Sequence, residues 1–391
     1  MRAALAAILL ACQLGAGSNH TAGGLQHFYN LEYDDAIAEF EKAVADEPSS
    51  AETHNNVAQA LMFREMYRDG ALETELVTGN NAFLRRPKMN APPEVEKRFF
   101  SEVQIAMQLS EREIEKNPRD VEALYALGVS HALRANYNYL VRRAWREALQ
   151  DATAGWKLHV KVSGIDPSNA DARLVQGVHD YVVASLPWAY RVLGFLVGFS
   201  GNREQGIRTL EEVARSGKRT SVDAQIFLCA LYRREGKPRQ ALPLIENLLA
   251  RFPRNHLLRL EQAQMYGQIG DKANAVASIM KVSEMKKAGV PGYSAIPWEK
   301  IHYHLGTVLF WYRDYAEALD LMTKVIAGAE RVDLNTGAIA WLRTGQIYDL
   351  TDRRKQAIEA YRKAIQFAPE ADAAKESKRY LSSPYRRAKG L

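Results

Sequence analysis

Apolar and polar positions alternate along this chain with the spacing of paired α-helices. The pattern is most complete in the segment 338–371, where small, aromatic and proline residues occupy fixed places of a 34-residue unit. Gly345 and Ala357 fall where the two helices of the unit should cross, because small residues allow a close approach. Proline ends a helix, so the second helix should stop before Pro369. The defining residues are Trp341, Gly345, Tyr348, Ala357, Tyr361, Ala364 and Pro369.

The same spacing recurs in other parts of the chain. An unbroken copy runs over 222–255, and further units begin at His256 and Glu299. The first unit begins close to Gly17, and three less regular units begin at Ala51, Val121 and Ala170. The segment 70–92 interrupts the second of these eight units with Gly and Pro signals of a loop. A single helical pair cannot bury its own apolar face, whereas stacked pairs can, so the units are expected to pack in a row.

The 34-residue pattern resembles the tetratricopeptide repeat (TPR). The resemblance implies an all-α fold, a right-handed superhelical solenoid of about eight TPR-like helical pairs with inserts. The segment 370–381 has the polar outer side of a C-terminal capping helix. We divide the chain into a signal peptide (1–17), N-terminal TPR-like repeats with long inserts (18–221), regular TPR repeats (222–371), and a capping helix and tail (372–391).

The first seventeen residues have the composition of an export signal. A positive start, an apolar stretch from Ala3 to Ala11 and small residues ending at Gly17 predict cleavage near Gly17 and a periplasmic or extracellular protein. An alternative is a membrane-anchored lipoprotein, because the residues before Cys12 resemble a bacterial lipobox, whose cysteine is acylated. A third alternative is an uncleaved anchor. Cleavage near Gly17 would leave Cys229 as the only cysteine, and its place in the repeat predicts a small core residue.

Charge distribution and the missing motifs favour a binding protein over a nucleic-acid-binding protein or an enzyme. The chain has 47% hydrophobic and 25% charged residues, which is ordinary for a globular protein. Its net charge of +6 comes from basic pairs scattered among acidic residues, so nucleic-acid binding is not expected. Sequence motifs of metal, nucleotide and acyl-transfer sites are missing. We therefore predict no enzyme activity, no catalytic residues, no cofactor and no metal site.

An apolar segment, 182–199, interrupts the repeats. Pro187 and Arg191 lie within it, which favours a helix buried in the solenoid over a membrane span. The sequence from Leu186 to Leu210 resembles a segment of the TPR family named for a yeast inclusion-body clearance protein. The resemblance includes a Leu-Pro element and the element from Gly198 to Glu204, with Asn202 in place of Asp. That resemblance implies an adaptor role connected with lipid stores or aggregates. The alternative function is therefore a lipid- or membrane-surface-associated protein that uses 182–199.

The first helix of each TPR-like unit should line a concave groove. Its side chains give a mixed aromatic and polar surface, which suits an extended or helical segment of another protein. The sequence thus predicts a non-enzymatic, exported scaffold or adaptor with a protein or peptide partner. The candidate groove residues are Asn55, Asn56, Tyr303, His304, Thr307, Phe310, Arg343 and Gln346.

Overall fold

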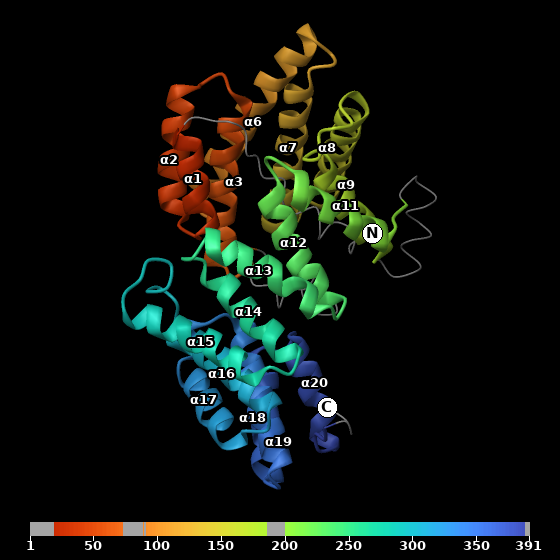
Figure 1. Ribbon diagram of the computed structural model, residues 1–391. Coiled ribbons are helices and arrows are strands. Elements are labelled where there is room, and N and C mark those ends of the chain that lie inside the picture. The colour runs from red at the N-terminus through yellow and green to blue at the C-terminus, as the bar shows by residue number, and fades with distance from the viewer. Residues whose placement is uncertain (1–18, 73–88, 90, 186–199, 388–391) are drawn as a thin grey trace. The chain divides into compact units, whose positions relative to one another are not determined.

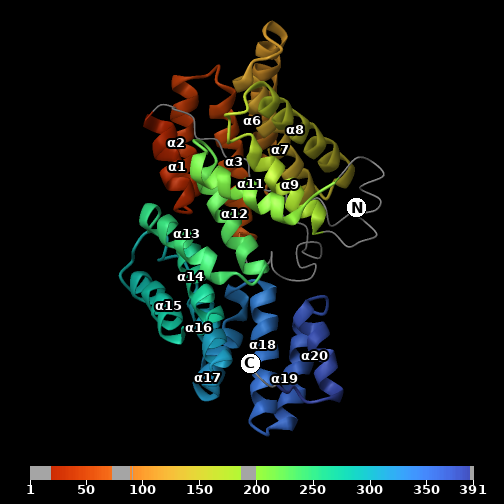
Figure 2. The same ribbon diagram turned by 45° about the vertical axis from the view of Figure 1, so that its right-hand side comes forward.

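The chain forms two compact units, Met1–Phe252 (unit 1) and Pro253–Leu391 (unit 2), in a computed structural model (Figures 1 and 2). The structure describes residues 19–72, 89, 91–185 and 200–387. Over these residues it contains seventeen α-helices and no β-strand, which confirms the predicted all-α fold. Consecutive helices pack as eight pairs, and one further helix follows the last pair.

Unit 1 contains the first five pairs. In both views of the structure α1, α2 and α3 lie side by side (Figures 1 and 2). A short π-helix, η2 (Asn138–Arg142), extends α7 before the chain turns into α8. The helices are α1 (Asn19–Tyr29), α2 (Tyr33–Asp46), α3 (Ala51–Arg68), α6 (Pro93–Lys116), α7 (Val121–Tyr137), α8 (Trp145–Ile165), α9 (Arg173–Ala184), α11 (Arg203–Ser216), α12 (Ser221–Arg234) and α13 (Pro238–Arg251).

Unit 2 contains three pairs and the additional helix α20 at its end. The predicted capping segment 370–381 corresponds to α20, which packs against both α18 and α19. A 3-10 turn, η3 (Ala329–Arg331), precedes α18. The helices are α14 (His256–Gln268), α15 (Lys272–Lys287), α16 (Trp298–Trp311), α17 (Tyr315–Ala327), α18 (Leu334–Leu350), α19 (Arg354–Phe367) and α20 (Asp372–Ser382).

Prolines set the ends of the second helices. In five pairs the second helix ends two residues before a proline, because proline disfavours helical geometry in the residue that precedes it. Side-chain caps start several of the following helices: Asp120, Asn202, Asn255, Asp271 and Asp333 each accept a hydrogen bond from a backbone N–H three residues later. The prolines are Pro48, Pro118, Pro167, Pro253 and Pro369.

The predicted close crossing in the last repeat is present between α18 and α19. A Cβ atom added at Gly345 would lie 2.4 Å from the ring of Tyr361, so no larger residue fits without a shift. Ala357 on α19 is fully buried. The interpretation of these two residues as packing residues is therefore confirmed.

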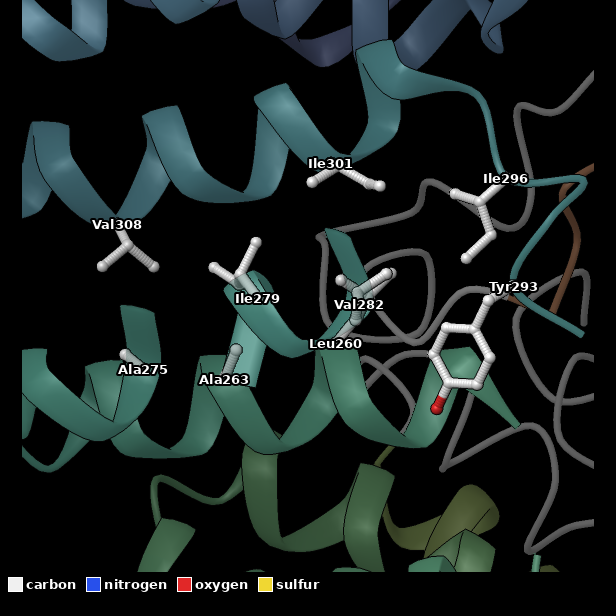
Figure 3. Packing of buried hydrophobic residues seen from close by; sticks show 9 residues of the cluster. All are labelled: Leu260, Ala263, Ala275, Ile279, Val282, Tyr293, Ile296, Ile301 and Val308. Atoms are coloured by element: carbon white, nitrogen blue, oxygen red, sulfur yellow. The ribbon is translucent and has the colours of Figure 1, made fainter. Parts of the chain in front are cut away.

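The core of unit 2 includes a connecting segment as well as helices. Residues from α14, α15 and α16 pack together with Tyr293 and Ile296, which lie between α15 and α16 (Figure 3). The hydroxyl of Tyr293 donates a hydrogen bond to the carbonyl of Pro253 over 3.0 Å. A connection between two helical pairs thus contributes a fully buried aromatic ring to the core.

In unit 1, the first helix contacts the last pair. The hydroxyl of Tyr29 on α1 donates to the carboxylate of Asp223 on α12 over 3.1 and 3.2 Å. The rings of Tyr29 and Phe252 have centroids 4.9 Å apart, and Gln26 donates to the carbonyl of Arg251. These contacts join the first helix of unit 1 to its last pair, between residues at least 194 positions apart. The repeat pattern in the sequence does not predict them.

Along the chain, the boundary between the two compact units falls at 252–253, whereas the regularity of the repeats suggested a boundary at 221–222. The two boundaries differ because α12, which begins the regular repeats, packs against α11 of the preceding pair. The regular repeats therefore do not form a separate compact unit. The predicted leader 1–17 and most of the apolar segment 182–199 lie outside the described residues. Among the helices that are described, none combines the length and the apolar character needed to cross a bilayer.

Candidate functional site

The predicted groove residues of unit 2 lie on α16 and α18, as expected, but most of them are buried. Tyr303 is 3% exposed and Phe310 is 0% exposed, and His304 and Gln346 are also buried. Only Thr307 and Arg343 keep partial exposure. The expectation that all six side chains form one open surface is therefore wrong.

Packing explains the burial of Tyr303 and Gln346. Tyr303 shares a hydrophobic cluster with Met322, Val325 and Ala340, so its ring fills space between helices. Gln346 accepts a hydrogen bond from Arg343 over 2.6 Å and donates one to Glu376 on α20 over 3.4 Å. These two residues hold the repeats together.

Asn55 and Asn56 on α3 are likewise buried. The Asn55 amide donates to the carbonyl of Ala126 on α7 over 3.0 Å and accepts from the hydroxyl of Ser130 over 2.8 Å. Asn55 thus links the first helices of two adjacent pairs. The early part of the predicted groove is an internal polar contact instead of an open surface, because α3 and α7 pack directly on each other.

Two of the predicted groove residues, Phe310 and Arg343, belong to a cation–aromatic cluster at the surface of unit 2. The guanidinium of Arg343 lies 4.7 Å from the ring centroid of Phe310 and 4.9 Å from that of Trp311. Trp311, the last residue of α16, is 45% exposed although it is a large aromatic residue. Both distances suit cation–π attraction. We call Phe310, Trp311 and Arg343 the α16/α18 patch.

Sequence reasoning found Phe310 and Arg343 but missed Trp311. Its position follows Phe310 directly, and neighbouring residues on a helix point about 100° apart. If Phe310 faces the core, Trp311 must lie toward the edge of the helix. The position of Trp311 next to Phe310 on the helix would therefore have indicated that its side chain is partly exposed.

A buried carboxylate lies close to the patch. The side chain of Asp349 at the end of α18 is fully buried and pairs with Arg354 at 3.0 Å. The same carboxylate accepts hydrogen bonds from the Tyr361 hydroxyl and from the backbone N–H of Tyr385, each over 2.8 Å. Desolvation by burial and the hydrogen bond to Asp349 raise the pKa of Tyr361 far above its ordinary value, so the phenol stays protonated.

A second charged group orders the start of α18. Lys300 on α16 lies 2.6 Å from Asp333, which caps α18 by accepting from the N–H of Thr336. Burial opposes ionisation of Asp333, but the attraction of Lys300 and the hydrogen bonds from Lys300 and Thr336 outweigh it and lower the pKa to about 2. Asp333 is therefore charged at neutral pH and fixes α16 against α18.

The described part of the chain contains one group of potential metal ligands that lie close together. Ligand atoms of His27, Glu32 and Asp35 lie within 4.8 Å of one another. A direct contact of 2.7 Å between His27 Nδ1 and Glu32 Oε2 accounts for that proximity. Cys229 is buried, in agreement with a core role. Cys12, the candidate for lipidation, lies outside the described residues.

Comparison with protein families matches this chain to the tetratricopeptide repeat over residues 21–64 and 231–282, and again over 338–370. No curated protein matches the chain significantly. The third matched segment contains the Gly345–Tyr361 crossing, and the second contains the connection between the two compact units.

Solved structures also resemble the chain. One is the Cut9-Hcn1 hetero-tetramer of the APC/C, with 14% identity and a TM-score of 0.49, over 90% of this chain and 54% of that chain. Our chain thus spans about half the length of that relative. A human IFIT1 dimer with m7Gppp-AAAA has 14% identity and a TM-score of 0.47, over 97% of this chain and 84% of that chain. The tetratricopeptide protein TTC0263 of Thermus thermophilus has 15% identity and a TM-score of 0.34, over 63% of this chain and 97% of that one.

The structure has helical pairs, a glycine at the close crossing of the last repeat and prolines after several second helices. Three segments of the chain also match the family models of the repeat. The chain therefore contains tetratricopeptide repeats.

Proposed function

We propose that this protein is a non-enzymatic scaffold or adaptor that holds a segment of another protein on the α16/α18 patch. Tetratricopeptide repeats are generally protein-interaction modules, which supports the class of function. The observation that carries the proposal is the exposure of Trp311 beside Arg343, at 45% of the tryptophan surface. Trp and Arg are enriched among the residues that dominate protein interfaces.

The patch combines an apolar face with a fixed positive charge. Phe310 anchors the cluster from below, because it is fully buried and its ring packs at 5.3 Å from that of Trp311. Arg343 is held by its contact with both rings and by its hydrogen bond to Gln346. A preorganised cluster loses little side-chain entropy on binding, so it can bind a partner efficiently.

We expect Trp311→Ala combined with Arg343→Ala to weaken partner binding at least tenfold, which is about 1.4 kcal/mol. Photo-crosslinking in a native extract, followed by mass spectrometry, would identify the partner. A titration with the purified partner would then give the affinity of each variant. Met280→Ala is the matched control, because Met280 is a similarly exposed apolar residue of unit 2 that lies on α15, outside the α16/α18 patch.

Unchanged affinity in the double variant, with unchanged helicity and melting temperature, would remove the α16/α18 patch from the binding site. Tyr303→Ala is unsuitable for this test. Its ring is buried in a hydrophobic cluster, so the substitution would leave a cavity and destabilise the repeats.

Export of the protein is a separate proposal that rests on residues 1–17. We expect the mature chain to begin near Ser18, because the small residues that end at Gly17 follow the apolar stretch. Intact-mass spectrometry of the protein from its native source checks this expectation. An intact Met1 would contradict cleavage, and a diacylated Cys12 would favour the lipoprotein alternative.

A further inference from the structure

After α20 the backbone becomes extended at Ser383, and the following residues return to the repeats. Within 383–387, Tyr385 and Arg387 are partly buried, whereas Pro384 and Arg386 are exposed. Alternate side chains of an extended segment point to opposite sides. One side of this segment therefore faces unit 2, and the other side faces solvent.

Tyr385 is the first of the two contacting residues. Its ring centroid lies 6.3 Å from that of Phe310 and 5.2 Å from that of Tyr380, and it packs against the cluster around Leu309 and Ile347. Its backbone N–H donates to the buried carboxylate of Asp349 over 2.8 Å. The tyrosine therefore combines an aromatic contact with a main-chain hydrogen bond.

Arg387 is the second contacting residue. Its guanidinium lies 5.6 Å from the ring centroid of Phe310 and 5.5 Å from that of Trp311, the same two rings that Arg343 contacts. It also donates to the carbonyl of Trp311 over 2.7 Å and to the hydroxyl of Tyr315 over 3.4 Å. The segment thus occupies part of the α16/α18 patch.

The contacts of the segment are separate from those that close the repeat array. α20 already covers the last repeat, since Ala373, Tyr380 and Leu381 pack against the cluster of Leu342 and Tyr361. Asp349 would keep its bonds to Arg354 and Tyr361 without the Tyr385 N–H. Release of 383–387 would therefore leave the Asp349 carboxylate with two partners and the last repeat covered by α20.

We propose that 383–387 is an internal ligand that competes with partner segments of the same chemistry for the α16/α18 patch. The partner segment is extended and carries an aromatic residue followed two positions later by an arginine. This inference rests on the proposed function and specifies the partner of the same surface. Main-chain hydrogen bonding to Asp349 supplies part of the affinity, and the two alternate side chains supply the selectivity.

Tethering makes the internal segment an effective competitor. A short flexible connection gives an effective concentration in the millimolar range. A partner segment with an affinity of tens of micromolar would therefore bind at least tenfold more weakly to the closed protein than to a protein whose own segment is released. The ratio of these two affinities is the quantity to measure.

The test uses the full chain with Tyr385→Ala and Arg387→Ala, and a fluorescent peptide of residues 382–391 as the probe. We expect the peptide to bind the double variant at least tenfold more tightly than it binds the wild-type chain, as measured by fluorescence anisotropy. Adding Trp311→Ala to the double variant should reduce peptide binding at least tenfold again. Arg386→Ala is the matched control in both chain and peptide, because Arg386 is adjacent, equally charged and exposed.

Two results would overturn the inference. One is a peptide that fails to bind the double variant while the melting temperature of that variant falls, since the segment would then be a permanent part of the fold. The other is equal peptide binding to the wild type and the double variant. Light scattering of the wild type checks for a segment donated by a second copy, and a concentration-dependent dimer that the double variant loses would contradict an internal ligand.

These results are distinguishable from a failure of the proposed function. Peptide binding reports only on the competition between 383–387 and its copy in solution. Loss or retention of partner binding in Trp311→Ala with Arg343→Ala reports on the function of the patch itself. A protein whose segment never leaves could still bind a partner elsewhere on the patch.

Discussion

Gly206→Ala should destabilise unit 1 by about 3 kcal/mol, at the upper end of the usual cost of overpacking a core. Gly206 on α11 faces Gly177 on α9 where the two helices cross. An added Cβ would lie 2.7 Å from the carbonyl oxygen of Gly177 and 2.7 Å from the backbone nitrogen of Tyr181. Backbone atoms cannot rotate away as a side chain can, so the two helices would have to separate.

Gly164→Ala is the control for this prediction. Gly164 lies on the exposed side of α8, and nothing would meet an added Cβ within 4 Å. Alanine should therefore stabilise the helix by about 0.5–1 kcal/mol through its higher helix propensity. Denaturant unfolding followed by circular dichroism compares the two variants. Equal stability of both would mean that α9 and α11 do not cross as closely as the structure shows.

Asp333→Ala should destabilise unit 2 by about 3 kcal/mol, which is typical of removing one partner from a buried ion pair. Asp333 is the acceptor for Lys300 over 2.6 Å and for the hydroxyl of Thr336 over 2.7 Å, and it caps α18. Lys300 is itself buried on α16. The substitution therefore removes the N-cap and a counter-charge in one step, and thermal or denaturant unfolding measures the loss.

Asp333→Asn separates these two effects. Asparagine caps a helix as well as aspartate does, so this variant should recover about 1 kcal/mol relative to Asp333→Ala. An equal loss in both variants would show that the charge alone matters.

The ion pair also predicts a pH dependence. Asp333 has a folded-state pKa lowered from 3.8 to about 2 by its partners, so its stabilisation is complete above about pH 4 and is lost as the pH falls toward 2. The shift corresponds to about 2 kcal/mol. Unfolding of the wild type should show this dependence between pH 4 and 2, and both Asp333 variants should lack that contribution. A wild-type curve that matches the variants throughout this window would contradict the lowered pKa.

Much of the helical architecture could be predicted because its causes are local. The spacing of Gly345 and Ala357 follows from a close crossing between two helices that are adjacent in sequence. Pro369 stops α19 through the backbone of the residue before it. Such effects act within one 34-residue unit, so a repeat pattern contains them.

The functional surface could be predicted only in part. The pattern placed Phe310 and Arg343 on neighbouring first helices, and the structure brings them within 4.7 Å. It did not distinguish an accessible side chain from a buried one, because accessibility depends on α20 and on the neighbouring pairs. Tyr303 and Asn55 therefore became core and linking residues, while exposed Trp311 was missed.

By itself, the sequence determined that this protein consists of helical pairs with tetratricopeptide spacing and where most of these helices begin and end. Only the tertiary structure decided that Tyr29 meets Asp223 and that Tyr293 enters the core of unit 2. It also decided that Tyr385 and Arg387 contact the α16/α18 patch. The physical reason is that helix formation depends on residues three or four positions apart, whereas these contacts join segments that are brought together only when whole repeats pack.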